Sequence, residues 1–136
     1  MAKEIDAIIK ALQDKTTALG GVQRAPDYVP GTAPDGIFAI AMPGTGRFVK
    51  GAGGRREGHH VARVFIGKAY KNLADDEERL LPYGDSFANA LIADPQLGNT
   101  VETVGEIRYD FVTDFDYGGI QHVGWTFEIE IKKITA

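Results

Sequence analysis

Residues 101–131 read VETVGEIRYDFVTDFDYGGIQHVGWTFEIEI, and two alternating segments lie on either side of a pair of glycines. In the first segment, apolar side chains recur at alternate positions, and polar side chains, most of them charged, lie between them. A period of two predicts a β-strand with one buried face and one face in solvent. The apolar positions are Ile107, Tyr109, Phe111 and Phe115, and the opposite positions are Glu106, Arg108, Asp110 and Asp114.

The segment after the glycines alternates in the same way. A turn at Asp116-Tyr117-Gly118-Gly119 joins the two segments, and a glycine pair in this place is typical of an antiparallel β-hairpin. We expect Trp125 and Phe127 to be buried beneath helices that carry Ile8, Leu12 and Leu91. Trp125 shares its face with Val123, Phe127, Ile129 and Ile131, and the opposite positions are His122, Thr126, Glu128 and Glu130.

Upstream of the hairpin, two segments have the spacing of amphipathic helices. From about residue 3 to residue 18, apolar side chains recur at helical intervals, and Gly20-Gly21 predicts the end of this helix. A second helix is expected to begin at the acidic run 75–78. Pro82 predicts a kink or a division of that helix into two pieces, and Asp94-Pro95 predicts its end.

Three further segments complete the expected order of elements. Residues 22–36 contain three prolines and predict an extended connector. Residues 37–42 are apolar at consecutive positions, as in a strand covered on both faces, and residues 60–70 alternate as a second strand. Together these segments predict one domain over residues 1–136 of the α+β class. It would have a mainly antiparallel sheet of about four strands, two helices on one face and a long C-terminal β-hairpin.

Composition narrows the possible functions. The chain has 136 residues, a net charge of −4 and 43% hydrophobic residues, which suits one globular domain and argues against a general nucleic-acid binder. It has no cysteine, so disulfides, thiolate metal sites and cysteine nucleophiles are excluded. The N-terminus has no apolar signal segment and no apolar run reaches transmembrane length, so we expect the protein to stay in the cytoplasm after synthesis.

The region that leads into the long strand carries a second signal. It reads Asp94-Pro95-Gln96-Leu97-Gly98-Asn99-Thr100-Val101. A helix ending in Asp-Pro-x-Leu-Gly-x-Thr-Val, then a long strand, a Tyr-Gly-Gly turn and a final aromatic strand, resembles the tail terminator (tail completion) proteins of long-tailed bacteriophages. The resemblance covers nearly the whole chain in length and element order, and its specific part lies within residues 79–131.

The resemblance implies a structural protein with no catalytic residues, metal or cofactor. Such proteins assemble as a ring, expected to be a hexamer, on the head-proximal end of a completed tail tube. The ring stops tube polymerisation and offers a surface to the filled head. The implied partners are further copies of the chain, the major tail tube protein and a head-completion or neck protein, with DNA at most passing through the ring lumen. The implied location is the host cytoplasm during assembly and then the head–tail junction of the virion.

A basic segment interrupts the otherwise acidic chain. Residues 44–58 contain six glycines and four basic residues, with Phe48 and Val49 between the basic side chains. The glycines predict a loop or hairpin tip that is mobile in the isolated protein and ordered in an assembly. A solvated loop without a binding role fits this composition, and so does docking on an acidic partner or on the DNA backbone.

Other candidate sites are weaker. The glycines of 44–54 have neither the spacing nor the following helix of a P-loop, so no nucleotide site is predicted. The histidines at 59, 60 and 122 lack metal-ligand spacing, and adjacent residues of a strand point to opposite faces. The carboxylates could form acid–base pairs, but the sequence shows no apolar cleft to tune them. The hairpin aromatics fit a sheet face under helices better than a stacking platform for single-stranded nucleic acid.

A head-to-tail ring requires two different, complementary patches on each subunit. The basic segment and the acidic helix start are the predicted halves. Two alternatives stay open, namely another phage neck or head-completion protein, and a small DNA-binding module that uses residues 44–58 against phosphate. The candidate interface residues are Arg47, Phe48, Lys50, Arg55 and Arg56 on one side and Asp75, Asp76, Glu77 and Glu78 on the other.

Overall fold

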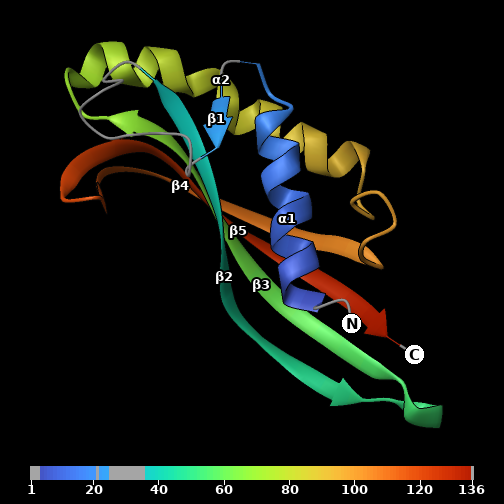
Figure 1. The fold of residues 1–136 in the computed structure, drawn as a ribbon. Coiled ribbons are helices and arrows are strands. Elements are labelled where there is room, and N and C mark those ends of the chain that lie inside the picture. Colours follow the sequence, from blue (N-terminus) through green and yellow to red (C-terminus); the bar gives the residue numbers. More distant parts are fainter. Residues whose placement is uncertain (1–3, 21, 25–35, 136) are drawn as a thin grey trace.

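Two helices lie on one face of a twisted β-sheet in the computed structural model, which describes residues 4–20, 22–24 and 36–135 (Figure 1). The elements are α1 Glu4–Thr17, β1 Val22–Arg24, β2 Ile37–Lys50, η2 Ala52–Gly54 (a 3₁₀ turn), β3 Arg56–Ala69, α2 Leu73–Ala93, β4 Thr103–Tyr117 and β5 Ile120–Thr135.

The sheet has the strand order β1-β2-β3-β5-β4. β1 runs parallel to β2, and the other neighbours are antiparallel. The predicted α+β class is therefore confirmed, with two helices, four antiparallel strands and a C-terminal hairpin. The strand β1 was not predicted; its three residues lie at the start of the expected connector 22–36. Most of that connector lies outside the described residues.

The main core lies between the helices and the sheet. Ile8 and Leu12 of α1 are buried there, as their helical spacing predicts. Alternate residues of β3 and β5 face them, because successive side chains of a strand point to opposite sides. The other large residues of this cluster include Val64, Ile66, Leu80, Phe87, Leu91, Phe127, Ile129 and Ile131.

The two aromatic residues expected under the helices differ in burial. Phe127 is fully buried and meets Phe87 of α2 edge-on, with ring centroids 4.8 Å apart. Trp125 is only half-buried; its indole Nε1–H donates to the carbonyl oxygen of Leu80 at 2.7 Å. Its ring lies against Gly84, where an added Cβ would come within 3.0 Å of the indole. Burial is therefore complete for Phe127 and partial for Trp125.

The opposite face of the sheet has a smaller aromatic core around Phe38 and Phe65, both fully buried. Phe115 stacks on Phe65 with ring centroids 3.9 Å apart, so it does not share the face of Phe111 as predicted. The cause is an irregularity in the pairing of β4 with β5 between Val112 and Phe115. A β-bulge of this kind reverses the side chains that follow it.

The glycine-rich segment 44–58 forms a hairpin, which is one of the two forms predicted for it; the other form, a loop without strand pairing, is wrong. β2 and β3 pair beyond Pro43, from Gly46 opposite His60 to Lys50 opposite Arg56. We call residues 46–60 the distal hairpin, which extends past the first turn of α1 (Figure 1). β5 pairs with the other edge of β3 along this length, which orders the segment within the chain. The segment is held by its own strand pairing, which argues against the mobility expected of it in the isolated protein.

Helix α2 begins two residues before the predicted start and is one continuous element. Asn72 is its N-cap, and the side-chain oxygen of Asn72 accepts from the backbone N–H of Ala74 at 3.1 Å. Pro82 lies inside the helix and does not divide it. Proline removes the donor to the Glu78 carbonyl, but both residues are exposed, so water can replace that bond.

Candidate interaction surface

The tip of the distal hairpin is a tight turn that depends on glycine. Gly53 and Gly54 have φ angles of 68° and 80°, in the left-handed region that other residues adopt at a cost. The Gly51 N–H donates to the carbonyl oxygen of Arg55 at 2.8 Å and closes the turn. The basic side chains therefore lie on an ordered arm.

Four basic residues and one aromatic residue are exposed along this arm. The Arg56 guanidinium lies over the Phe48 ring, 4.4 Å from its centroid. Phe48 is nevertheless 48% exposed. Within the part of the chain that the structure describes, Arg47, Lys50 and Arg55 make no ion pair. Three cations and an aromatic ring are thus available to a partner.

The base of the distal hairpin is fastened to α1 and β5 through Glu4. His60 Nε2 lies 2.5 Å from one carboxylate oxygen of Glu4, and Arg56 lies 3.5 Å from the other. The Thr135 hydroxyl donates to Glu4 at 2.8 Å. Burial alone raises the pKa of Glu4, but the hydrogen bonds from His60 and Thr135, together with the nearby positive charges, lower it below its usual value. An ionised carboxylate thus joins three elements.

The acidic half of the predicted interface is smaller than expected. Asp75, Glu77 and Glu78 are exposed on the first turns of α2. Asp76 is only 3% exposed, which corrects its prediction as an interface residue. Helical geometry turns Asp76 by about 100° from each neighbour, and this places it on the side of α2 that faces the sheet.

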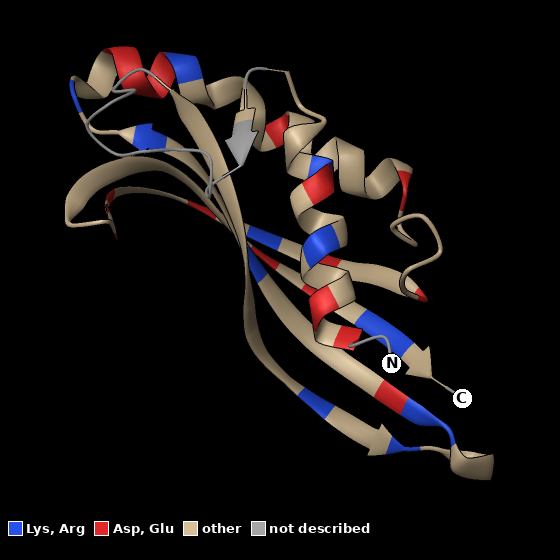
Figure 2. Cartoon of the chain, viewed as in Figure 1, with Lys and Arg blue, Asp and Glu red and all other residues tan. Residues whose placement is uncertain are grey.

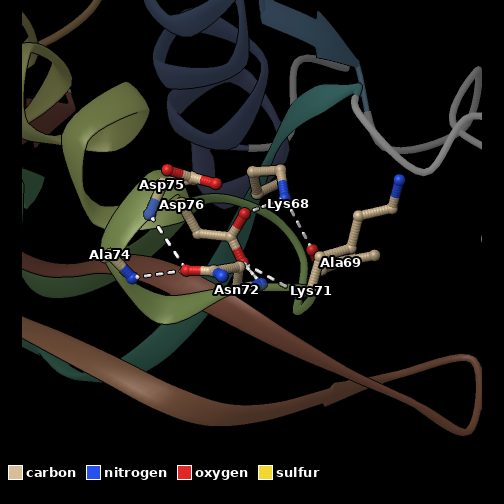
Figure 3. A network of polar contacts seen from close by, with 7 residues as sticks. All are labelled: Lys68, Ala69, Lys71, Asn72, Ala74, Asp75 and Asp76. Carbon is tan, nitrogen blue, oxygen red and sulfur yellow. Dashed lines mark hydrogen bonds and ion pairs between the residues drawn. The ribbon is translucent and has the colours of Figure 1, made fainter.

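Asp76 forms a buried polar network with Lys68 at the end of β3 (Figure 3). The Lys68 ammonium donates to the Asp76 carboxylate and, at 2.9 Å, to the carbonyl oxygen of Ala69. The backbone N–H groups of Lys71 and Asn72 donate to the other carboxylate oxygen at 2.8 and 3.1 Å. Burial raises the pKa of Asp76, but the bonds from Lys68 and Lys71 outweigh it and lower the pKa. The network fixes α2 to β3.

The basic and acidic halves lie at opposite ends of the molecule. Figure 2 shows basic residues towards the tip of the distal hairpin and acidic residues on the first turns of α2, with the body of the sheet between them. The two halves are therefore too far apart to pair within one chain. They can meet only between two copies or with other molecules.

A groove between α2 and β4 was not predicted from the sequence. It has a volume of about 320 Å³ and is lined by Leu81, Gly84, Asp85, Ala88, Tyr109 and Trp125. Tyr109 is 71% exposed and meets the Trp125 ring edge-on, with centroids 5.6 Å apart. The sequence signal is a glycine within a helix opposite an aromatic strand, and it has meaning only once the two elements are known to touch. We call this feature the α2–β4 groove.

The histidines do not form a metal site. His60 contacts Glu4, whereas its neighbour His59 points to the other face and lies 3.3 Å from Glu57. His122 is buried elsewhere, and burial lowers its pKa. Among the described residues, no three His, Asp or Glu side chains come close enough together to hold a metal ion. The helices within the same ranges are too short or too polar to cross a membrane.

No protein-family model matches this sequence, and the comparison with curated proteins found no match either. Two exposed, oppositely charged ends lie on one ordered domain, and aromatic, apolar and acidic side chains line a groove beside one of them.

Proposed function

We propose that this chain is a structural ring subunit of the tail-terminator kind. Copies would assemble head to tail, expected as a hexamer, on the head-proximal end of a phage tail tube. The ring would stop tube polymerisation and present a surface for the head. It would use complementary surfaces alone, without a reaction or a cofactor.

The observation that carries this proposal is the separation of charge between the two ends. The distal hairpin offers Arg47, Lys50 and Arg55, and the start of α2 offers exposed carboxylates at the far end. A contact between two different patches is heterologous, and repeating it by a rotation that returns to its start gives a closed ring. The resemblance of residues 79–131 to tail terminators supports the same conclusion.

The strength of such a ring would come from repetition. An exposed ion pair contributes only about 0–1 kcal/mol. Three cations on each hairpin, together with the half-exposed Phe48, would act at every contact around the ring. Assembly should therefore weaken at high salt, because salt screens exposed charges.

The remaining partners would occupy the two flat sides of the ring. The major tail tube protein would bind one side, and a head-completion or neck protein the other. Such a protein would assemble in the host cytoplasm and end at the head–tail junction of the virion.

Native mass spectrometry and electron microscopy of the purified protein, alone and with tail tubes, test this proposal. Rings that cap tubes are the expected result. Lys50→Glu with Arg55→Glu should abolish assembly and leave the fold intact, because both side chains are exposed and unpaired among the described residues. Arg56 is unsuitable for this test because it is paired with Glu4. Lys10→Glu reverses the charge of another exposed lysine, on α1, and is the control for the single variant Lys50→Glu.

Two results would separate the parts of this proposal. Monomers under every condition, with tubes left uncapped, would overturn the ring. Rings that persist in the double charge reversal would retain the ring and remove the distal hairpin from its interface. A neck or head-completion protein would form rings that bind heads and leave tubes uncapped.

DNA binding is a second candidate because the exposed cations Arg47, Lys50 and Arg55 of the distal hairpin could contact the phosphate groups of DNA. A DNA-binding module would show an affinity that falls steeply with salt and would form no rings without DNA. Ring formation in the absence of DNA favours the structural role.

A further inference from the structure

The outward face of α2 combines acidic and apolar side chains. Residues 78, 81, 85, 88 and 92 recur at intervals of three and four, so they lie along one side of the helix. They are Glu78, Leu81, Asp85, Ala88 and Ile92. Leu81 and Ile92 are 49% and 67% exposed, so this side of the helix presents aliphatic as well as acidic surface.

This face continues into the α2–β4 groove. Leu81, Asp85 and Ala88 form one wall, and Tyr109 and Trp125 form the other. Aromatic faces beside a carboxylate are suited to a guanidinium or ammonium group, which can stack on the ring and pair with the acid. The groove therefore matches a partner that is both basic and apolar.

The distal hairpin has these properties. Lys50 and Arg55 flank its tip, and Phe48 is 48% exposed between basic neighbours. Its turn is closed by a backbone hydrogen bond, so little order would have to be gained on binding. Groove and hairpin are thus complementary in charge and in apolar character.

We propose that the α2–β4 groove of one copy receives the distal hairpin of the next copy. This inference rests on the proposed ring and assigns its subunit contact. The hairpin cannot reach the groove of its own chain, because it extends away from α2 at the other end of the sheet (Figure 1). Two grooves cannot face each other favourably, because Glu78 and Asp85 would oppose their counterparts. The contact is therefore heterologous.

Cysteine cross-linking tests the contact directly, since the natural chain contains no cysteine. One protein carries Lys50→Cys on the hairpin, and a second carries Ala88→Cys in the groove. The two are mixed under assembly conditions and treated with a short bis-maleimide, which tolerates a wider range of distances than a disulfide. We expect a covalent dimer from the mixture and none from either protein alone. A protein that carries both Lys50→Cys and Ala88→Cys should give a series of cross-linked oligomers, from the dimer up to the number of subunits in the ring.

Two controls make the result specific. Lys10→Cys replaces Lys50→Cys in the mixture and should give only background cross-linking, because Lys10 lies on α1. Asp85→Lys should weaken association on the order of tenfold, because it places like charges in contact. Combining Asp85→Lys with Lys50→Glu and Arg55→Glu should restore assembly by exchanging the charges. Circular dichroism and thermal unfolding check that each variant folds.

The outcomes distinguish this contact from the ring itself. If the unmodified protein forms rings but the mixed pair cross-links no more than the Lys10→Cys control, the inference is wrong and the ring stands. Cross-linking of Ala88→Cys to itself, or of Lys50→Cys only to tube or neck protein, would also overturn it. Monomers with uncapped tubes would overturn both proposals.

Discussion

The molecule contains two long antiparallel β-hairpins, and different elements surround each of them. The terminal hairpin, formed by β4 and β5, lies under α2 and buries Phe127 and Ile129 in the main core. The distal hairpin extends beyond the helices, and most of its β2 residues are exposed. It is held by the strand ladder, the glycine turn and the contacts of Glu4.

The terminal hairpin therefore stabilises the domain, whereas the distal hairpin projects from the domain into solvent. Apolar burial is the dominant favourable contribution to folding, so the terminal hairpin stabilises the domain more than the distal hairpin does. An arm ordered before binding loses less conformational entropy on binding than a mobile loop. The distal hairpin is therefore suited to reach a partner, and changes in it should affect assembly more than folding.

The largest expected effect comes from truncating the aromatic core residue of the terminal hairpin. Phe127→Ala should lower the free energy of unfolding by about 3–5 kcal/mol, because it leaves a cavity beside Phe87. Phe48→Ala on the distal hairpin is the matched control and should cost under about 1.5 kcal/mol, since Phe48 is half exposed. Urea titrations of both variants measure the difference. Equal losses would mean that the two hairpins contribute alike.

The second prediction concerns the buried ion pair that fixes α2 to β3, the strand beside the terminal hairpin. Lys68→Met leaves the Asp76 carboxylate buried without its cation and should cost about 3–5 kcal/mol of unfolding free energy. Adding Asp76→Leu removes the unpaired carboxylate, so the double variant should have a higher free energy of unfolding than Lys68→Met alone. Thermal and urea unfolding compare the three proteins. A double variant less stable than Lys68→Met would show that Asp76 acts mainly through its bonds to the backbone.

Side-chain periodicity predicted the terminal hairpin well because its alternation reports one buried face directly. The faces of Phe127, Ile129 and Ile131 on β5 follow from spacing alone. The same reasoning misplaced Phe115, since a period of two is valid only while the strand is regular. The bulge after Val112 depends on pairing with β5, and one sequence does not show that pairing.

Composition was misleading where tertiary contacts override local preference. Glycines predicted a mobile loop or hairpin tip at 44–58; the segment is a hairpin, and pairing of β3 with both β2 and β5 holds all of it except the turn at 51–55 as strands. Asp76 looked like its acidic neighbours until the position of Lys68 was known. The α2–β4 groove joins residues far apart in the chain, so no local pattern could show it.

The third prediction uses the carboxylate that holds the distal hairpin to α1. Glu4→Gln should lower the free energy of unfolding by about 1.5–3 kcal/mol at neutral pH, because charged hydrogen bonds to His60 and Thr135 are weakened. The pKa of Glu4 is lowered on folding, so its ionised form contributes stability above the unfolded pKa and loses it as pH falls through the folded pKa.

The difference between the natural protein and Glu4→Gln should therefore shrink below about pH 4. Asp6→Asn, which changes an exposed carboxylate on the same helix turn, is the control and should change the free energy of unfolding at neutral pH by less than about 0.5 kcal/mol. Urea titrations at several pH values measure both. A constant gap between the natural protein and Glu4→Gln down to low pH would show that Glu4 acts by its shape and not by its charge.

The smallest expected effect compares the glycine turns of the two hairpins. Gly53 in the distal turn and Gly119 in the terminal turn have φ angles of 68° and 78°, and open space surrounds both Cα atoms. Alanine at either position should therefore strain the backbone by a similar amount, about 1–2 kcal/mol.

The terminal turn is closed by the pair Tyr117–Ile120, and Tyr117 packs against the smaller aromatic core around Phe38 and Phe65. Gly119→Ala should therefore lower the global free energy of unfolding by nearly this amount. The distal tip can open without disturbing either core, so Gly53→Ala should lower it by less and speed amide hydrogen exchange at residues 50–56 instead. Equal global losses, with exchange at the tip unchanged, would show that the distal hairpin unfolds together with the rest of the domain.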